Sequence, residues 1–281
     1  MLGHKLWQRL HPDFDTWVTL RGDFSAYARY GLFEQGKTIC RVDAMQFDTV
    51  VRAMESVRPD VVVNAIGIVK QLQAANDPIV SISINSLFPH QLAKLCRGAS
   101  AKLIHVGTDC VFSGRKGMYG ESDVSDAEDL YGRSKYLGEV NEKDHLTLRT
   151  SIIGRELNTA NGLVEWLLSN RGRKVKGYRR AIFSGLTTIA FAGVIGKVIG
   201  EHRNLAGLYQ VSCDPIDKYA LLQLLQRSFH APVDIEPADD VVVDRSLNST
   251  RFREATGWAP PPWRQSIEAM ASDPTPYDAW R

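Results

Sequence analysis

VVVNAIG, residues 61–67, is the stretch from which the fold of this chain can be worked out. Three adjacent valines without polar alternation are typical of a strand buried on both faces of a parallel sheet, and we expect this strand to cover residues 61–65. Before it, residues 47–57 carry apolar side chains at helical spacing, and Arg58-Pro59 stops that helix. A helix that leads into a wholly apolar strand predicts an α/β fold.

The same alternation continues on both sides of this stretch. Further strands are expected at residues 17–20, 102–106 and 146–149, and further helices at residues 84–96 and 131–141. Strict alternation of strand and helix predicts right-handed βαβ units and a Rossmann-like, doubly wound parallel sheet. Beyond residue 150 the alternation weakens. We therefore expect one domain over residues 1–150 and a smaller lobe over residues 151–281, with some segments of the lobe returning to the first domain.

The composition excludes several classes of function. The 281 residues carry a formal net charge of +2, which is too balanced for a nucleic-acid-binding protein. No apolar run is long enough to span a bilayer. The four cysteines form no C-x-x-C pair and have no histidine at metal-ligand spacing, so we expect free thiols and no metal site. These features predict a cytoplasmic protein with a small-molecule partner and without a nucleic-acid or membrane partner.

Polar residues follow three of the predicted strands. They are residues 64–67, Gly107-Thr108-Asp109 and Arg149-Thr150-Ser151. Each group taken alone can be explained by the chemistry of turns. In a doubly wound sheet, however, ligands gather at the carboxyl ends of the strands. The shared position of the three groups therefore predicts a binding site at this edge.

Tyr131 and Lys135 are four residues apart on a predicted helix, so their side chains share a face. A free tyrosine has a pKa of about 10. We expect the ammonium group to lower the pKa of Tyr131, which would make it a general acid or base. An ordinary surface helix would show the same spacing. Thr108 favours the catalytic interpretation, because its hydroxyl group can bind a substrate carbonyl oxygen; the alternative is a threonine that caps a turn.

Several stretches, in this order, resemble the extended short-chain dehydrogenase/reductases, and within them the dTDP-4-dehydrorhamnose reductase group. They are MLGHKL (1–6), NAIG (64–67), IN (84–85), GTDCVFSG (107–114), YGRSK (131–135), GE (138–139) and LRTS (148–151). The tail over residues 249–263 is also similar to that group. The resemblance covers nearly the whole chain and implies a Rossmann-like domain with a smaller substrate-binding lobe.

The resemblance implies an NAD(P)H-dependent reductase of the C4 keto group of an NDP-4-keto-6-deoxy sugar. Tyr131 would protonate the keto oxygen, Lys135 would hold the nicotinamide ribose, and Thr108 would bind the same carbonyl group. Asn85 would support a proton-relay water, and Asp43 would lie near the adenine. Tyr131 and Lys135 would also contact the cofactor, together with Met1, Leu2, Gly3, Asp43, Ala44, Ala65, Ile66 and Gly67. The substrate-binding residues would be Thr108, Asp109, Ser151 and Arg155.

The chain departs from the family pattern at its start. The family opens with a strand and a G-x-x-G-x-L-G turn, whereas Met1-Leu2-Gly3 match only the last three positions of that turn. The first strand and two phosphate-binding glycines are therefore expected to be missing from this chain. An upstream start codon, a fragment or a degenerate relative would each explain this departure, and we favour the first explanation.

Three further features bear on the ligands. Arg21 follows the strand at residues 17–20, where a basic side chain can accept the 2′-phosphate of NADPH, although Asp23 would suit NADH. We expect NADPH, with NADH as the alternative.

The basic residues between 171 and 180 are expected to form a solvated face, or alternatively to contact a substrate diphosphate. Ile152-Ile153 replace an aromatic residue that is usual in the rhamnose-forming enzymes, which leaves the sugar open.

Two other functions compete with the reductase. A sugar-nucleotide epimerase would use the same Tyr131 and Lys135 but would return the hydride. A non-catalytic NADP-binding regulatory subunit would fit the incomplete phosphate-binding turn. The presence of Thr108, Tyr131 and Lys135 together favours an enzyme with a sugar-nucleotide substrate. A homodimer is a further expectation.

Overall fold

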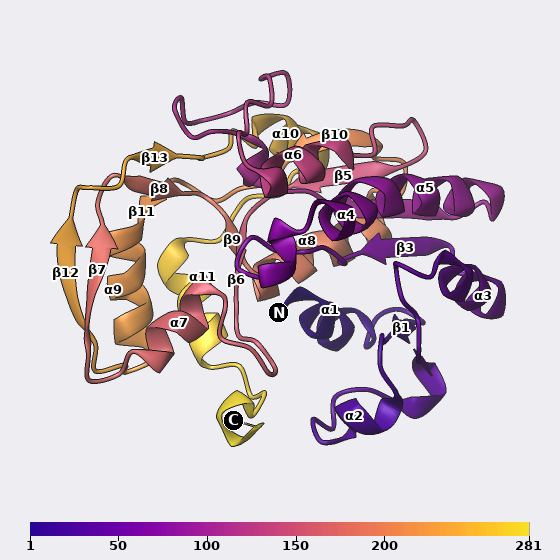
Figure 1. The fold of residues 1–281 in the computed structure, drawn as a ribbon, viewed down its shortest axis with the longest axis horizontal. Coiled ribbons are helices and arrows are strands. Elements are labelled where there is room, and N and C mark those ends of the chain that lie inside the picture. Colours follow the sequence, from indigo (N-terminus) through magenta and orange to yellow (C-terminus); the bar gives the residue numbers. More distant parts are fainter. Residues whose placement is uncertain (281) are drawn as a thin grey trace.

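The computed structural model describes residues 1–280 and centres on a four-stranded parallel sheet (Figure 1). The strand order is β10-β5-β4-β3, and every neighbouring pair is parallel. The strands are β3 (Val61–Asn64), β4 (Lys102–Val106), β5 (Leu146–Arg149) and β10 (Gly207–Gln210). β10 belongs to the second half of the sequence, so the C-terminal part of the chain returns to complete the sheet.

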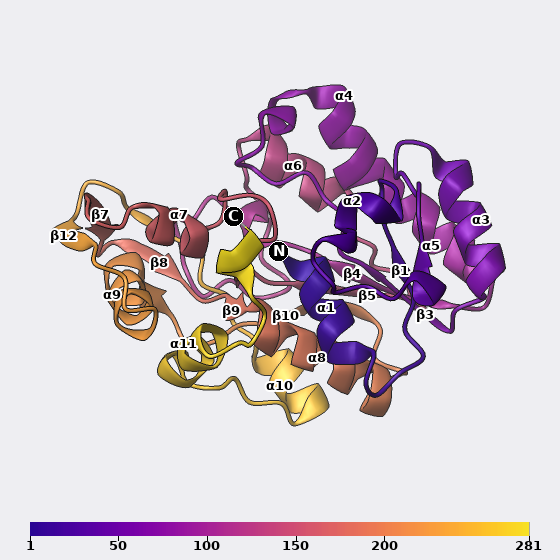
Figure 2. The same ribbon diagram turned by 90° about the horizontal axis from the view of Figure 1, so that it is seen from below.

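Helices cover both faces of this sheet (Figure 2). They are α3 (Phe47–Val57) and α5 (Phe88–Gly98) on one face, and α1 (Leu2–Leu10) and α8 (Thr188–Glu201) on the other. The neighbouring residues Leu103 and Ile104 of β4 point into the two different cores, as side chains on a strand alternate between faces. The predicted α/β class with a doubly wound parallel sheet is confirmed.

A separate pair of strands lies beside β3. β1 (Val18–Thr19) pairs in parallel with β2 (Thr38–Ile39), and among the described residues neither strand pairs with β3. Residues of β1 and β3 instead line a common cavity of about 550 Å³. The strand predicted at residues 61–65 is therefore in the right place, but its predicted burial is wrong: residues 61–63 are only half-buried, because one edge of β3 borders this cavity.

The C-terminal lobe packs small sheets against helices around its own core. Its sheets are β6–β9, β7–β12 and β11–β8–β13. Its strands are β6 (Ile152–Ile153), β7 (Lys174–Tyr178), β8 (Ala181–Phe183), β9 (Leu186–Thr187), β11 (Ile216–Asp217), β12 (Asp234–Ala238) and β13 (Val243–Asp244). Its helices are α7 (Leu163–Ser169), α9 (Lys218–Ser228), α10 (Thr250–Thr256) and α11 (Trp263–Ala271). Buried Leu221, Leu225 and Ile267 show that α9 and α11 share this core.

Further short helices and turns connect the strands of the first half of the chain. They are α2 (Phe24–Ala28), α4 (Pro78–Ser81), the π-helix η3 (Ile82–Leu87), the short turn η4 (Asp109–Val111) and α6 (Leu130–Leu137). The predicted helix over residues 84–96 is thus divided into η3 and α5. The helix predicted over residues 131–141 ends at Leu137, because Gly138 caps α6 and packs closely against η3.

The two ends of the described chain lie side by side (Figure 2). His4 Nε2 lies 2.7 Å from the hydroxyl oxygen of Tyr277, and Lys5 Nζ lies 2.7 Å from a carboxylate oxygen of Asp273. The C-terminal segment therefore fixes the first turn of α1. Among residues 1–280, no helix is both long enough and apolar enough to cross a bilayer.

Candidate active site

Helix α6 carries the two residues singled out by their spacing. It begins at Leu130, where the Asp129 side chain accepts a hydrogen bond from the amide of Gly132 at 2.8 Å. Lys135 is buried, and its Nζ donates to the main-chain oxygen of Val106 at the end of β4 (2.9 Å). Burial lowers the pKa of Lys135 to about 8, and the negative charge of Glu139 raises it in part.

Asn85 of the π-helix η3 joins the ends of β3 and α6. Its Oδ1 accepts a hydrogen bond from the amide of Ile68 (2.9 Å), and its Nδ2 donates to the Ile68 carbonyl and to the hydroxyl oxygen of Ser134. A side chain at Gly67 would place its Cβ 3.4 Å from Asn85 Oδ1 and 3.9 Å from Lys135 Nζ. Gly67, Asn85 and Lys135 therefore meet at one point.

Ser134 and Gly138 belong to the same cluster; both lie in stretches that resemble the family, but neither was predicted as a site residue. Ser86 donates from its hydroxyl group to the carbonyl oxygen of Ser134 at 2.7 Å, and Ser134 also meets Asn85. π-helices are rare and are frequent at functional sites. No periodicity of the sequence predicts this one, because it depends on the contact between η3 and α6.

Thr108 lies at the carboxyl end of β4 and caps η4. Its hydroxyl oxygen accepts a hydrogen bond from the amide of Cys110 (3.2 Å) and lies 3.3 Å from a carboxylate oxygen of Asp109. The side chain also forms a hydrogen bond with Tyr131, which lowers the pKa of that phenol. The structure therefore brings Thr108 and Asp109, at the end of β4, together with Tyr131 of α6.

The expected lowering of the Tyr131 pKa by Lys135 is wrong for this structure. Burial raises the pKa of Tyr131 above its ordinary value, and its hydrogen bond with Thr108 offsets only part of that rise. The Lys135 ammonium points instead to the carbonyl oxygen of Val106. Desolvation of the phenolate is thus the dominant effect, and it keeps Tyr131 protonated.

Two predicted sugar-binding residues flank this cluster. Asp109 is buried, its amide donates to the carbonyl oxygen of Thr150 (3.1 Å), and burial raises the pKa of its carboxyl group. The carbonyl oxygen of Ser151 accepts from the amide of Leu186 at 2.8 Å. Asp109 therefore belongs to the cluster, whereas the main-chain oxygen of Ser151 is held by Leu186 of β9 and by the hydroxyl group of Thr150.

Arg155 has different neighbours from those expected of a substrate-binding residue. Its Nε donates to Glu165 Oε1 (2.7 Å), and its Nη2 donates to Asp278 Oδ1 (2.5 Å). The guanidinium group also lies over the ring of Tyr277, 4.8 Å from its centroid. The edge of the guanidinium group thus binds two carboxylates and its face contacts Tyr277, and these contacts hold the C-terminal segment in place.

The residues near Lys135 fit the ribose of a nicotinamide cofactor. An ammonium group has three donors, and within residues 1–280 the one hydrogen bond found for Lys135 Nζ goes to Val106. Two donors are thus available for ribose hydroxyl groups. Ala65 and Ile66 continue from β3 beside Gly67, and the side chain of Ile66 is exposed.

The start of α1 fits the cofactor's pyrophosphate less well. Met1 is the N-cap and makes no side-chain cap, Leu2 is buried in the core, and Gly3 is exposed. Burial lowers the pKa of the Met1 amino group, whereas the nearby charges of Glu156 and Glu165 raise it. A helix N-terminus ordinarily favours an anion, but two carboxylates at this position oppose one.

The residues predicted around the adenine lie at the ends of β1 and β2. Arg21 is exposed, and Asp23 is paired with Arg41 at 2.6 Å. Arg41 follows β2, and its amide also donates to the carbonyl oxygen of Gly22 at 3.4 Å. The Asp43 carboxylate accepts from the amide of Met45 (2.9 Å), next to half-buried Ala44.

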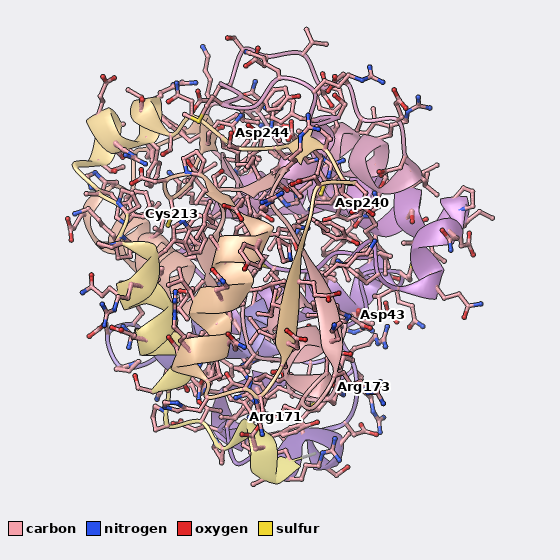
Figure 3. All side chains as sticks on the ribbon, turned by 90° about the vertical axis from the view of Figure 1, so that its left-hand side faces the viewer. Asp43, Arg171, Arg173, Cys213, Asp240 and Asp244 are labelled. Atoms are coloured by element: carbon pink, nitrogen blue, oxygen red, sulfur yellow. The ribbon has the colours of Figure 1, made fainter. Side chains whose placement is uncertain are left out.

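The basic stretch between residues 171 and 180 forms part of an ion-paired surface. Lys174, Lys176 and Arg179 pair with Glu236, Asp240 and Asp239 respectively. Arg171 and Arg173 lie before β7, at the opposite end of the strand pair from Asp240 (Figure 3). These contacts favour the solvated-face interpretation of the cluster. Within residues 1–280, no group of three His, Cys, Asp or Glu side chains is arranged to hold a metal ion.

Comparison with known proteins identifies the family of this chain. The sequence pattern of the RmlD substrate binding domain matches residues 4–176. The dTDP-4-dehydrorhamnose reductase of Aggregatibacter actinomycetemcomitans is 25% identical over 258 residues, which are 81% of this chain and 85% of that protein. The chain spans only 36% of the length of two other curated relatives that it matches.

Two solved structures share the fold. One is the dTDP-4-dehydrorhamnose reductase of Bacillus anthracis in complex with NADP, with a TM-score of 0.72, 20% identity, and coverage of 91% of this chain and 98% of that one. The other is the UDP-glucose 4-epimerase of Thermus thermophilus in complex with NAD, with a TM-score of 0.75, 19% identity, and coverage of 96% and 94%. Because the family pattern matches more than half of the chain, this protein belongs to the RmlD substrate binding domain family.

Proposed function

We propose that this chain reduces the C4 keto group of an NDP-4-keto-6-deoxy sugar with NADPH or NADH, in the supply of nucleotide sugars for surface polysaccharide. The observation that supports this most is that Thr108 and Tyr131 lie beside each other, while Lys135, one helical turn after Tyr131, reaches the end of β4. Membership of the RmlD substrate binding domain family and the NADP and NAD carried by the two structural neighbours support it as well.

Each residue of the cluster has a proposed role. The bound nicotinamide supplies the hydride. Thr108 holds the keto oxygen by a hydrogen bond, and Tyr131, kept protonated by burial, donates its phenolic proton to that oxygen. Lys135 holds the nicotinamide ribose with its two available donors, and Asn85 orders a water molecule that returns a proton to the cluster.

The two halves of the chain have different proposed tasks. Residues 1–150 bind the cofactor, with Arg21 favouring NADPH, and residues 151–281 bind the sugar nucleotide, with segments such as β10 returning to the first domain.

We also propose a homodimer, because apolar Ile79, Leu87 and Leu137 are exposed on neighbouring helices. Sedimentation analysis that finds only monomers at micromolar concentration would contradict the dimer.

The reaction is tested by mixing the purified chain with NADPH and with dTDP-, UDP- and GDP-linked 4-keto-6-deoxy sugars. Reduction predicts loss of the nicotinamide absorbance at 340 nm with one equivalent of sugar product per NADPH. An epimerase would change the sugar without net consumption of NADPH. Absence of turnover with every sugar, in a preparation that binds NADPH, would rule out the reductase.

One observation favours a second candidate, a non-catalytic cofactor-binding subunit. The carboxylates of Glu156 and Glu165 near the start of α1 oppose the pyrophosphate of a dinucleotide. A regulatory subunit would tolerate weak cofactor binding and would not turn over. Calorimetric titration with NADPH, run beside the turnover assay, separates the two functions, because only the reductase combines binding with oxidation of NADPH.

A further inference from the structure

The cavity between β1 and β3 is large for the interior of a sheet protein. Its volume is about 550 Å³, and residues of β1, β3, α1 and α3 all contribute to its lining. Protein interiors are close-packed, with few voids larger than a water molecule. The lining is more apolar than polar, so much of its apolar surface lacks the packing contacts that a protein interior normally provides. This cavity is therefore a place where binding of a matching ligand would stabilise the fold.

The backbone around the cavity determines what kind of ligand fits. β3 pairs with β4 along one edge, and β1 pairs with β2 along one edge. Within residues 1–280, the opposite edge of each strand has no strand partner, and both strands line the cavity. Backbone amide and carbonyl groups in such a position require hydrogen-bond partners. A peptide strand supplies both donors and acceptors along its length, whereas a lipid or detergent chain supplies neither.

The side chains around the cavity determine the composition of that strand. On one face of the sheet the lining includes Leu6 and Leu10 of α1, and on the other it includes Val50 and Met54 of α3. Successive side chains of a strand point to opposite faces, so a strand in the cavity would meet an apolar wall on each side. Strands buried in this way are continuous runs of Val, Ile and Leu.

We propose that the cavity between β1 and β3 binds an extended apolar peptide segment as an additional parallel strand. The segment is rich in Val and Ile and spans about five residues, which at about 3.3 Å per residue matches the length of β3. It would join the two separate sheets into one. This inference concerns the fold and does not depend on the proposed reductase activity.

The test uses the full chain and a synthetic peptide with five consecutive Val and Ile residues between solubilising lysines. At a hundredfold excess over its Kd the peptide is expected to raise the Tm by roughly 5–10 °C. Hydrogen exchange should slow at Val18–Thr19 and at Val61–Asn64. A peptide of the same composition with proline at its centre should do neither, because proline lacks the amide donor and breaks a buried strand.

A pair of variants on α3 completes the test. Ala53 is buried and lines the cavity, whereas Ser56 is exposed on the same helix. Ala53→Phe should fill the cavity and abolish the response to the peptide, and Ser56→Phe should retain it. The proposal is overturned if the peptide leaves these amides unprotected, or if dodecane or the proline peptide protects them equally. Protection of β3 that rises with protein concentration alone would instead identify a second copy of the chain as the occupant.

Discussion

Gly138 packs so closely against Asn85 that a Cβ atom at Gly138 would lie 1.8 Å from the Asn85 carbonyl oxygen. This contact joins the end of α6 to the π-helix η3. It therefore sets the position of Asn85 relative to Lys135, which lies one turn before Gly138 on the same helix. A main-chain atom cannot move aside as a flexible side chain can, so the position accepts only glycine.

Gly138→Ala is expected to destabilise the fold by about 1–3 kcal/mol, because η3 and α6 must separate to admit the methyl group. The Tm should fall by roughly 2–10 °C. Gly193→Ala is the matched control, since Gly193 lies within α8 with nothing within 4 Å of its Cβ position. Thermal unfolding of both variants checks the prediction, and equal Tm values for them would contradict it.

Tyr131→Phe is expected to lower kcat by roughly 10²–10⁴-fold and to leave the Kd for NADPH nearly unchanged, because only the proton donor is removed. Tyr136→Phe on the same helix is the control, since Tyr136 is exposed and should retain full turnover. Steady-state kinetics and a fluorescence titration with NADPH measure the two quantities. Full turnover by the Tyr131→Phe variant would remove the phenol from the mechanism.

Much of the fold could be predicted because its signals are local. The predicted bounds at residues 47–57, 102–106 and 146–149 are those of α3, β4 and β5. Amphipathic spacing and apolar runs between turns identify such elements within a few residues. The position of Thr108 at the sheet edge was also predictable, since it directly follows the strand predicted at residues 102–106. Its meeting with Tyr131 could not be derived from this edge, because Tyr131 lies on helix α6.

The rest depends on contacts between residues that are distant in sequence. The position of η3 depends on its close contact with Gly138. The guanidinium group of Arg155 is paired with Asp278, which lies 123 residues later in the sequence. The pKa of Tyr131 could not be predicted from its spacing to Lys135, because burial and the direction of an ammonium group are tertiary properties. No local pattern carries such information.

Glu165→Gln is expected to lower the free energy of unfolding by about 3–5 kcal/mol, because it removes the buried carboxylate of the Arg155 ion pair and leaves only the exposed carboxylate of Asp278. Asp278→Asn should cost less than about 1 kcal/mol, because that carboxylate is 76% exposed and its ion pair is screened. Urea unfolding compares the two. If Arg155 mainly binds substrate, both variants should instead change KM more than stability.

Arg21→Ala is expected to raise the KM for NADPH about tenfold and to leave the KM for NADH unchanged, because only NADPH carries a 2′-phosphate. Arg21 is exposed at the end of β1, and Arg41, which is exposed and paired with Asp23, lies in the same region. Arg52→Ala, on the exposed surface of α3, is the control. An equal change in the KM for NADPH and for NADH would show that Arg21 does not bind the 2′-phosphate.

Lys135→Met is expected to stabilise the free protein at pH 7. The pKa of Lys135 is lowered from 10.5 to about 8 by burial, so between these values the unfolded chain binds more protons than the folded one. The stability of the wild type therefore rises with pH across this window, and the charged lysine costs about 3 kcal/mol below it.

The methionine variant lacks this charge, so its advantage in Tm should be largest at or below pH 8 and should vanish near pH 10.5. Thermal unfolding from about pH 6.5 to about pH 10.5 measures the difference between the two proteins. The variant should lose cofactor affinity at every pH, because the donors of Lys135 are gone. A Tm difference that stays constant with pH would show that the ammonium is not destabilised in the folded state.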